Sequence, residues 1–294
     1  MPSRRQIREA VVQFLYCADL EGGADPSELR EPFWQFVTES DRKALVLATW
    51  KSLRHFAAGR EERLDELLTR LPAARDALAG DPALERPAEL LERIATLEHE
   101  WSNRLHALSN LRRDDDPDLV TQRFTEGFDR LFSIDRDLTA ARTEFLRTLD
   151  DHPDLRPKLE PVAGTLNRLG RISDRLKQLE HPEKFPDQVD LKKIISSRTS
   201  IEELRRNTDR TVDAVLAVKP QLDEKLDAVI ENFAPERIDP IDRAILRLGA
   251  WEILHDPEVP HPVAINEAVE LAKKFGTSDS GRFVNGILDR IAKG

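Results

Sequence analysis

Apolar residues recur at intervals of three and four positions along almost the whole chain, and few stretches alternate with a period of two. Residues three or four apart share one face of an α-helix, whereas a period of two is typical of strands. The pattern therefore predicts an all-α protein.

The N-terminal segment predicts two amphipathic stretches. Residues 3–20 carry one apolar stripe, and Gly22-Gly23 can end this helix because glycine reaches left-handed backbone angles. After a short segment at 32–36, a second stripe begins near Ser40, a suitable N-cap, and continues to Leu71. We expect one continuous helical stripe from Ser40 to Leu71.

Residues 72–190 differ from both ends of the chain. Their amphipathic stretches are separated by proline-containing joints at 81–82, 114–117, 152–153 and 185–186. Between 155 and 176 the apolar residues keep a four-three rhythm, as in a coiled-coil seam. We interpret this region as an inserted helical hairpin or small bundle.

From about residue 200 the helix boundaries become explicit. Asp239 is a predicted N-cap, followed by Pro240 at the first helical position and Asp242 in the first turn, where the helix dipole favours an acid. Another helix should open at Pro262 and end at Gly276 in a left-handed cap. Residues 277–280 offer several N-caps for a last helix.

Composition favours a cytosolic protein. The chain of 294 residues is 39% hydrophobic and 34% charged, with a mean hydropathy of −0.51. No apolar run approaches the roughly 18 residues of a membrane span, and no signal peptide is visible at the start. The single cysteine, Cys17, cannot form an intramolecular disulfide, which fits a reducing compartment. We expect a cytoplasmic location.

The charge distribution leaves room for only a local nucleic-acid site. A net charge of −10 and a pI near 5.4 argue against a general basic coat. The first eight residues nevertheless contain Arg4, Arg5 and Arg8 and no acid. This cluster can be a local RNA-binding patch or a solvated terminus.

Motifs for catalysis are missing from the sequence. It has no phosphate loop, no dinucleotide fingerprint and no nucleophile elbow. His99 and His106 are seven residues apart, whereas a zinc helix needs histidines four apart, and no third ligand is evident. We expect no metal, no cofactor and no enzymatic activity.

Two parts of the chain resemble the NusB family of transcription antitermination factors. The C-terminal part carries RAILRL at 243–248, WEIL at 251–254, VAINEAVELAK at 263–273 and RFVNGILD at 282–289. The opening helix adds Arg4-Arg5, Arg8-Glu9, Val12-Gln13 and Leu15-Tyr16. The order and spacing agree over about sixty residues of the C-terminal part, which makes the resemblance specific.

The resemblance implies a NusB-like helical bundle of two small helical subdomains, interrupted by the insertion. We place the first part of the core at 1–58, the inserted helical region at 59–199 and the second part of the core at 200–294. The family's third helix can correspond to 44–71 or to 201–218, since both carry a suitable stripe. We favour an insertion between the second and third family helices.

The resemblance also implies a function without catalysis. Family members bind boxA-type RNA as a heterodimer with NusE, a small-subunit ribosomal protein, and so act indirectly on the RNA polymerase antitermination complex. The residues that match RNA-binding positions are Arg4, Arg5, Arg8, Arg247, Asp279, Arg282 and Phe283. For Phe283 core packing competes with base stacking, for Asp279 helix capping competes with an RNA contact, and for Arg247 a structural ion pair competes.

Tyr16, Glu236 and Asp242 match family positions at the NusE interface. Tyrosine suits interfaces because it offers area and a polar tip, and carboxylates suit a basic ribosomal protein. A half-buried core tyrosine and ordinary helix-start acids are the alternatives. Three readings stay open for the whole chain: a NusB-like interaction module that has lost RNA binding, an accessory domain related to ribosomal RNA methyltransferases, and a homodimer.

Overall fold

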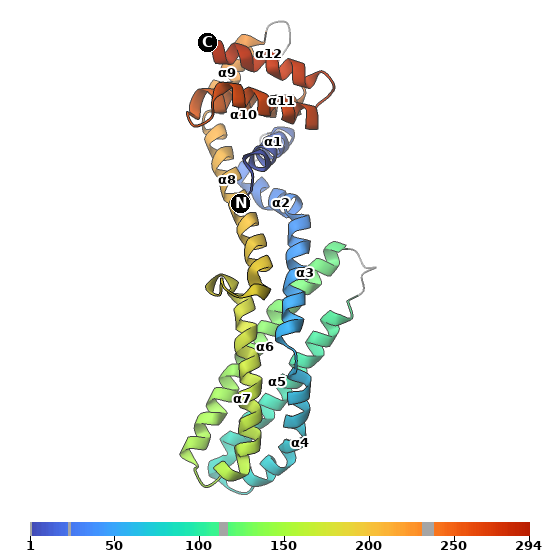
Figure 1. Ribbon diagram of the computed structural model, residues 1–294, viewed down its shortest axis with the longest axis vertical. Coiled ribbons are helices and arrows are strands. Elements are labelled where there is room, and N and C mark those ends of the chain that lie inside the picture. The colour runs from blue at the N-terminus through green and yellow to red at the C-terminus, as the bar shows by residue number, and fades with distance from the viewer. Residues whose placement is uncertain (1, 23–24, 112–116, 231–237) are drawn as a thin grey trace. The chain divides into compact units, whose positions relative to one another are not determined.

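A computed structural model of the chain describes residues 2–22, 25–111, 117–230 and 238–294. Every regular element in these ranges is a helix, either α or a short 3-10 turn (Figure 1), which confirms the all-α expectation. The chain divides into two compact units. The first consists of Met1–Ser40 and Arg198–Gly294, and the second of Asp41–Ser197.

The first unit is built from seven helices of the described chain. They are α1 (Arg4–Leu20), α2 (Pro26–Val37), the part of α8 (Lys192–Ala217) from residue 198 onward, α9 (Lys219–Val229), α10 (Pro240–His255), α11 (His261–Phe275) and α12 (Ser280–Lys293). Two of them begin with an acid followed by proline. Asp25 Oδ1 accepts the Ser27 N–H at 2.8 Å, and Asp239 Oδ1 accepts the Ile241 N–H at 2.9 Å. The predicted cap at Asp239 is therefore confirmed.

The core of the first unit joins the two ends of the chain. α1 packs against α10, and α10 packs in turn against α11 and α12. Side chains buried in this core include Val11 and Phe14 from α1, Ile245 and Leu248 from α10, and Leu288 from α12. Residues more than 220 positions apart thus share one apolar interior, which fixes α1 beside the last three helices.

Gly249 allows the close crossing of α10 and α12. A Cβ atom at this position would lie 2.6 Å from Leu288 Cδ1, closer than real Cβ contacts come. The absence of a side chain, and not an unusual backbone angle, is what the crossing requires here.

The second unit is a helical bundle with its own core. Its long helices are α4 (Arg60–Leu78), α5 (Glu85–Ser109), α6 (Pro117–Asp151) and α7 (Arg156–Glu180), with residues 41–56 of α3 (Glu39–Phe56) and the 3-10 turns η1 (Pro82–Leu84), η2 (Pro182–Lys184) and η3 (Val189–Leu191). α5 lies along α6, and α4 lies along α7 (Figure 1). Leu131, Leu138 and Phe145 of α6 are fully buried in this core.

A charged network lies inside the second unit. Arg60 Nη2 bonds Glu98 Oε2 at 2.8 Å, and Arg142 bonds the other oxygen of Glu98. Ser173 Oγ accepts from Arg142 Nη1 at 2.8 Å and donates to Asp135 Oδ1 at 2.7 Å. Four helices therefore meet at one set of buried polar contacts, and a buried charge is tolerated only when it is paired in this way.

Two expectations about helix boundaries are wrong. The stripe from Ser40 to Leu71 is split, because α3 ends at Phe56 and α4 begins at Arg60 after Gly59, whose φ is +79°. Gly276 has a φ of −95° and is not a left-handed cap. A Cβ at Gly276 would instead lie 2.5 Å from Ser280 Oγ, so space and not chirality calls for glycine there.

Residues 41–58 pack with the second unit, although sequence patterns assigned them to the family core. The boundaries of that core at 58 and 199 stay a prediction. The division into units follows which residues pack together, whereas the predicted boundaries follow which residues the family shares. Within the described ranges, no helix has the length and apolar character needed to cross a membrane.

Candidate functional site

The first turn of α1 presents two exposed arginines. Ser3 Oγ accepts the Gln6 N–H at 3.2 Å, and Gln6 Oε1 accepts the Ser3 N–H at 2.8 Å, which together form a capping box. Arg4 and Arg5 follow this cap and are exposed, with no acid in the first turn. This end of α1 can therefore offer guanidinium groups to an anion.

Arg8 has a different environment, although it lies on the same helix. It is buried, and its Nε donates to Glu252 Oε1 at 2.8 Å while its Nη1 lies 3.6 Å from Glu267 Oε2. Burial raises the pKa of Glu252, against the opposing pull of Arg8. Arg8 therefore ties α1 to α10 and α11, and its guanidinium is engaged within the protein.

Ion pairs connect the start of α1 with the end of α11. Arg5 Nη2 lies 3.6 Å from Glu270 Oε2, and Lys274 Nζ lies 2.8 Å from Glu9 Oε1. Lys273 pairs with Glu270 at 2.8 Å, and its side chain also lies near Gly281 at the start of α12. Lys273 and Lys274 are basic residues that sequence reasoning missed, because α11 read as a family structural helix.

α12 begins after a short turn, residues 276–279, that follows the end of α11. Asp279 is exposed at the N-cap position, where its side chain makes no capping hydrogen bond, although its carbonyl accepts the N–H groups of Arg282 and Phe283 at 3.1 and 3.0 Å. The Ser280 hydroxyl bonds the Thr277 N–H at 2.9 Å. Arg282 is exposed, and Phe283 is half-buried against the core.

Arg247 lies in a buried junction of three helices. Its Nε and Nη2 bond the two oxygens of Asp223 at 2.6 and 3.0 Å, and its Nη1 bonds Asp19. Burial opposes the charge, but the hydrogen bonds and negative charges of Asp223 and Asp19 together outweigh it and raise the pKa of Arg247 above its ordinary value. This geometry favours the structural ion pair over a phosphate contact.

Among the described residues, those predicted to contact the protein partner do not form one cluster. Tyr16 is half-buried against the core of the first unit. Asp242 is buried, accepts from Ser280 Oγ at 2.9 Å and leaves Oδ1 without a hydrogen-bond partner among the described residues. Burial raises the pKa of Asp242. Glu236 lies outside the described residues.

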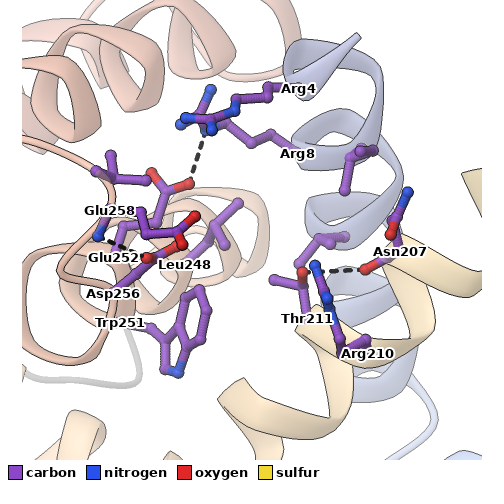
Figure 2. Close-up of a pocket in the computed structure, with 13 residues that line it drawn as sticks. Arg4, Arg8, Asn207, Arg210, Thr211, Leu248, Trp251, Glu252, Asp256 and Glu258 are labelled. Atoms are coloured by element: carbon purple, nitrogen blue, oxygen red, sulfur yellow. Dashed lines mark hydrogen bonds and ion pairs between the residues drawn. The ribbon is translucent and has the colours of Figure 1, made fainter. Parts of the chain in front are cut away.

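A hollow of about 220 Å³ opens beside α1 in the first unit. Figure 2 shows Arg4 and Arg8 on one side, Asn207 and Arg210 of α8 on another, and Trp251 of α10 on a third. Asp256 and Glu258 of the following loop complete its polar lining. Sequence reasoning missed this set, because its residues lie on three segments that only the fold brings together.

A metal centre has no support in the described ranges. No group of three or more histidine, cysteine, aspartate or glutamate side chains there is arranged to hold an ion. His106 contacts Glu61 at 2.7 Å, and His99 is exposed on α5.

Comparison with known proteins identifies relatives of the C-terminal part. The NusB family model matches residues 176–293, a range that includes 201–218 and leaves out 44–71. The match therefore favours 201–218 as the counterpart of the family's third helix. The opening helix lies outside the matched range, so its family correspondence stays a prediction.

Curated relatives carry the description "Transcription antitermination protein NusB". The chain is 42% identical to that of Pseudothermotoga lettingae over 90 residues, which are 31% of this chain and 64% of the relative. It is 47% identical to that of Sorangium cellulosum over 89 residues, 30% of this chain and 64% of the relative. The chain thus spans slightly under two thirds of the length of these two relatives.

A third relative is matched over more of its length, and one solved structure is also similar. The chain is 41% identical to the protein of the same description from Dehalococcoides mccartyi over 103 residues, 35% of this chain and 72% of the relative. A solved structure of NusB from T. maritima is 33% identical and is matched over 40% of this chain and 84% of its own, with a TM-score of 0.31. On the identity and coverage of the Dehalococcoides relative, this chain belongs to the NusB family.

Proposed function

We propose that this protein is a transcription antitermination factor that binds boxA-type RNA together with NusE and performs no catalysis. The observation that carries the proposal is the packing of α1 against α10, in the same unit as α12. Ion pairs of Arg5 with Glu270 and of Lys274 with Glu9 also join α1 to α11. Residues from both ends of the chain can therefore act on one ligand. The description of the curated relatives as transcription antitermination proteins supports the same role.

The proposed RNA surface runs from the start of α1, across the end of α11, to the start of α12. Arg4 and Arg5 would contact phosphates, since guanidinium groups bind them well. Lys274 and Arg282 would add two further phosphate contacts. Phe283 would stack on an unpaired base, a contact that contributes about 1–3 kcal/mol per base. Asp279 would accept from a base or a ribose hydroxyl, because an acid repels phosphate.

Arg8 and Arg247 have a different role in this proposal. Both guanidinium groups are committed to carboxylates within the protein, so they would hold α1 in place and not touch RNA. Tyr16 and Asp242 remain the proposed contacts with NusE, together with Glu236. A carboxylate face would attract a basic ribosomal protein and speed its encounter.

A gel-shift titration tests the proposal with a matched pair of variants. Arg4→Ala/Arg5→Ala removes two exposed arginines of the proposed surface, and Arg147→Ala/Arg156→Ala removes two exposed arginines of the second unit. Each lost contact to single-stranded RNA should lower the slope of log affinity against log salt by about 0.7, so the first variant should lose about 1.4 and the second none. Adding NusE should strengthen binding by the wild type.

A second candidate function is favoured by the burial of Arg8 and Arg247, which leaves fewer basic groups for RNA. In this alternative the chain is a protein-interaction module that binds NusE alone. The same titration separates the two functions. RNA affinity that is absent, or equal for wild type and Arg4→Ala/Arg5→Ala, would favour the second candidate.

A further inference from the structure

The hollow beside α1 has apolar and aromatic residues in its lining. Val11, Leu248 and Val259 are buried and form apolar lining. The half-buried indole of Trp251 forms part of its wall (Figure 2). An apolar lining with an aromatic wall suits a flat heteroaromatic group, while the polar residues around it can read the edge of that group.

Charged groups of both signs line this hollow without ion pairs between them. Arg4 and Arg210 form no ion pair with any described residue, and the same holds for the carboxylates of Asp256 and Glu258. Asp256 Oδ1 does accept the Glu258 N–H at 3.1 Å. By contrast, Arg8 and Glu252 in the same lining bond each other at 2.8 Å. Charged groups of both signs that lack ion pairs favour a ligand that carries an anionic group and also hydrogen-bond donors.

Guanine is the nucleobase that fits these charges. It presents two adjacent donors, N1–H and N2–H, which one carboxylate can accept together. Adenine, cytosine and uracil instead place an acceptor beside their donor, and this acceptor would face the carboxylate unfavourably. Arginine donates to the O6 and N7 atoms of guanine on its other edge, a role open to Arg210.

We infer that this hollow binds a guanosine nucleotide, with Trp251 against the base, Asp256 or Glu258 on the N1–N2 edge, and Arg4 on the phosphate. The nucleotide can be one unit of a bound RNA or a free nucleotide, and both present the same groups. The RNA source rests on the proposed function, and the free source does not.

The experiment uses the full chain and two ligands. The first is 5′-GMP, compared with 5′-AMP, with binding followed by saturation-transfer NMR of the base protons. The second is a boxA-type RNA, compared with the same RNA carrying inosine at each guanosine in turn. Inosine lacks only the N2 amine, so it removes one donor and leaves the ring and phosphate intact.

Two variants locate the site, and a third is the control. Glu258→Gln and Asp256→Asn remove the carboxylates with little change in shape, and Glu160→Gln removes an exposed carboxylate of the second unit. Thermal unfolding of each variant checks that the fold is kept. A good base contact contributes roughly 5- to 150-fold in discrimination, so inosine at one position should weaken RNA binding by that factor. The same substitution should have little further effect in the carboxylate variants.

The outcomes separate this inference from the proposed function. If inosine substitution weakens RNA binding and 5′-GMP gives a saturation-transfer signal, the hollow binds a guanosine of the bound RNA. If 5′-GMP gives a signal but inosine does not change RNA affinity, the hollow binds a free nucleotide. Binding of 5′-GMP without any RNA binding supports the hollow and contradicts the RNA role. Salt-dependent RNA binding, with no 5′-GMP signal and no effect of inosine, overturns the inference that the hollow binds guanosine and leaves the RNA role intact. The inference is also overturned if 5′-GMP and 5′-AMP bind with equal affinity to the wild type and to both carboxylate variants.

Discussion

At the scale of single residues, the arginines of the first unit fall into two groups. Arg4 and Arg5 carry exposed guanidinium groups, whereas those of Arg8 and Arg247 are buried against carboxylates. A buried guanidinium cannot leave its partner without uncovering a charge, so it stabilises the fold and is not available to a ligand. Stability and binding should therefore respond separately to mutation of the two groups.

Arg247→Ala should lower the free energy of unfolding by about 3–5 kcal/mol, because it leaves Asp19 and Asp223 without their partner. Arg206→Ala, at an arginine with 71% side-chain exposure on α8, is the control and should stay within about 0.5 kcal/mol of wild type. Urea unfolding measures both. A stable Arg247→Ala variant that has lost RNA affinity would instead make Arg247 an RNA contact.

The buried carboxyl group of Asp242 should make the free energy of unfolding depend on pH in one direction. Burial raises its pKa above the ordinary value of 3.8, so the folded state holds the proton more tightly than the unfolded chain does. Its contribution is then greatest below pH 3.8 and is lost as the pH rises through the folded-state pKa. The free energy of unfolding of wild type relative to Asp242→Asn should therefore fall as the pH rises above 3.8.

Ser280→Ala provides the matching test for Asp242. It removes the hydroxyl that donates to the carboxylate, so the loss of stability with rising pH should become larger than in wild type. Urea unfolding between pH 3 and about pH 7 measures these differences. Equal pH profiles for wild type and Asp242→Asn would contradict the buried position of this carboxylate.

Sequence patterns did not distinguish the exposed arginines of α1 from the buried one. The three arginines of α1 looked alike in the sequence, since each follows or precedes polar neighbours. What distinguishes Arg8 is Glu252, which lies 244 positions away and is brought to it only by the fold. Asn207, Arg210 and Trp251 were missed at the hollow for the same reason.

At the scale of elements, helix starts were easier to predict than breaks. Asp239 and Pro240 mark a start by local chemistry alone, and the structure has the helix begin there. The break between α3 and α4 was missed because the apolar stripe continues on both sides of it, and only Gly59 marks the change of direction. The class of each element follows from the apolar spacing, but its ends depend on single residues.

Gly59→Ala should destabilise the protein by about 1–2 kcal/mol, since its φ of +79° is costly for a residue with a Cβ. Gly170→Ala in the interior of α7 is the control. Neither Cβ would meet an atom within 4 Å, so the two variants differ in backbone angle and not in space. The control should stabilise by about 0.4–1 kcal/mol, because glycine is unfavourable inside a helix. Equal changes in thermal unfolding for both variants would contradict a left-handed angle at Gly59.

At the scale of the whole molecule, the described residues form two separate hydrophobic cores, one in each unit. The first unit contains the proposed RNA surface and the hollow, while the second contains the charged network and a long helical bundle. The sequence predicted the all-α class and the change of character in the middle of the chain. It could not predict that residues 41–58 pack with the bundle, because either unit could bury the same apolar stripe.

Two buried leucines test the independence of these cores. Leu131→Ala in α6 and Leu288→Ala in α12 each remove a fully buried side chain and should each cost about 2–5 kcal/mol. We expect calorimetry to resolve two transitions, of which each variant lowers one, and only Leu288→Ala should weaken RNA binding on warming. A single transition lowered equally by both variants would show one cooperative unit instead.

The most direct test of the account is photo-cross-linking of one boxA-type RNA that carries 4-thiouridine, followed by mass spectrometry of the attached peptides. With NusE present, we expect this RNA to label peptides from the start of α1 and from the start of α12, around Phe283. Labelling confined to peptides of the second unit, or of only one of these two helices, would contradict a binding surface made by both ends of the chain.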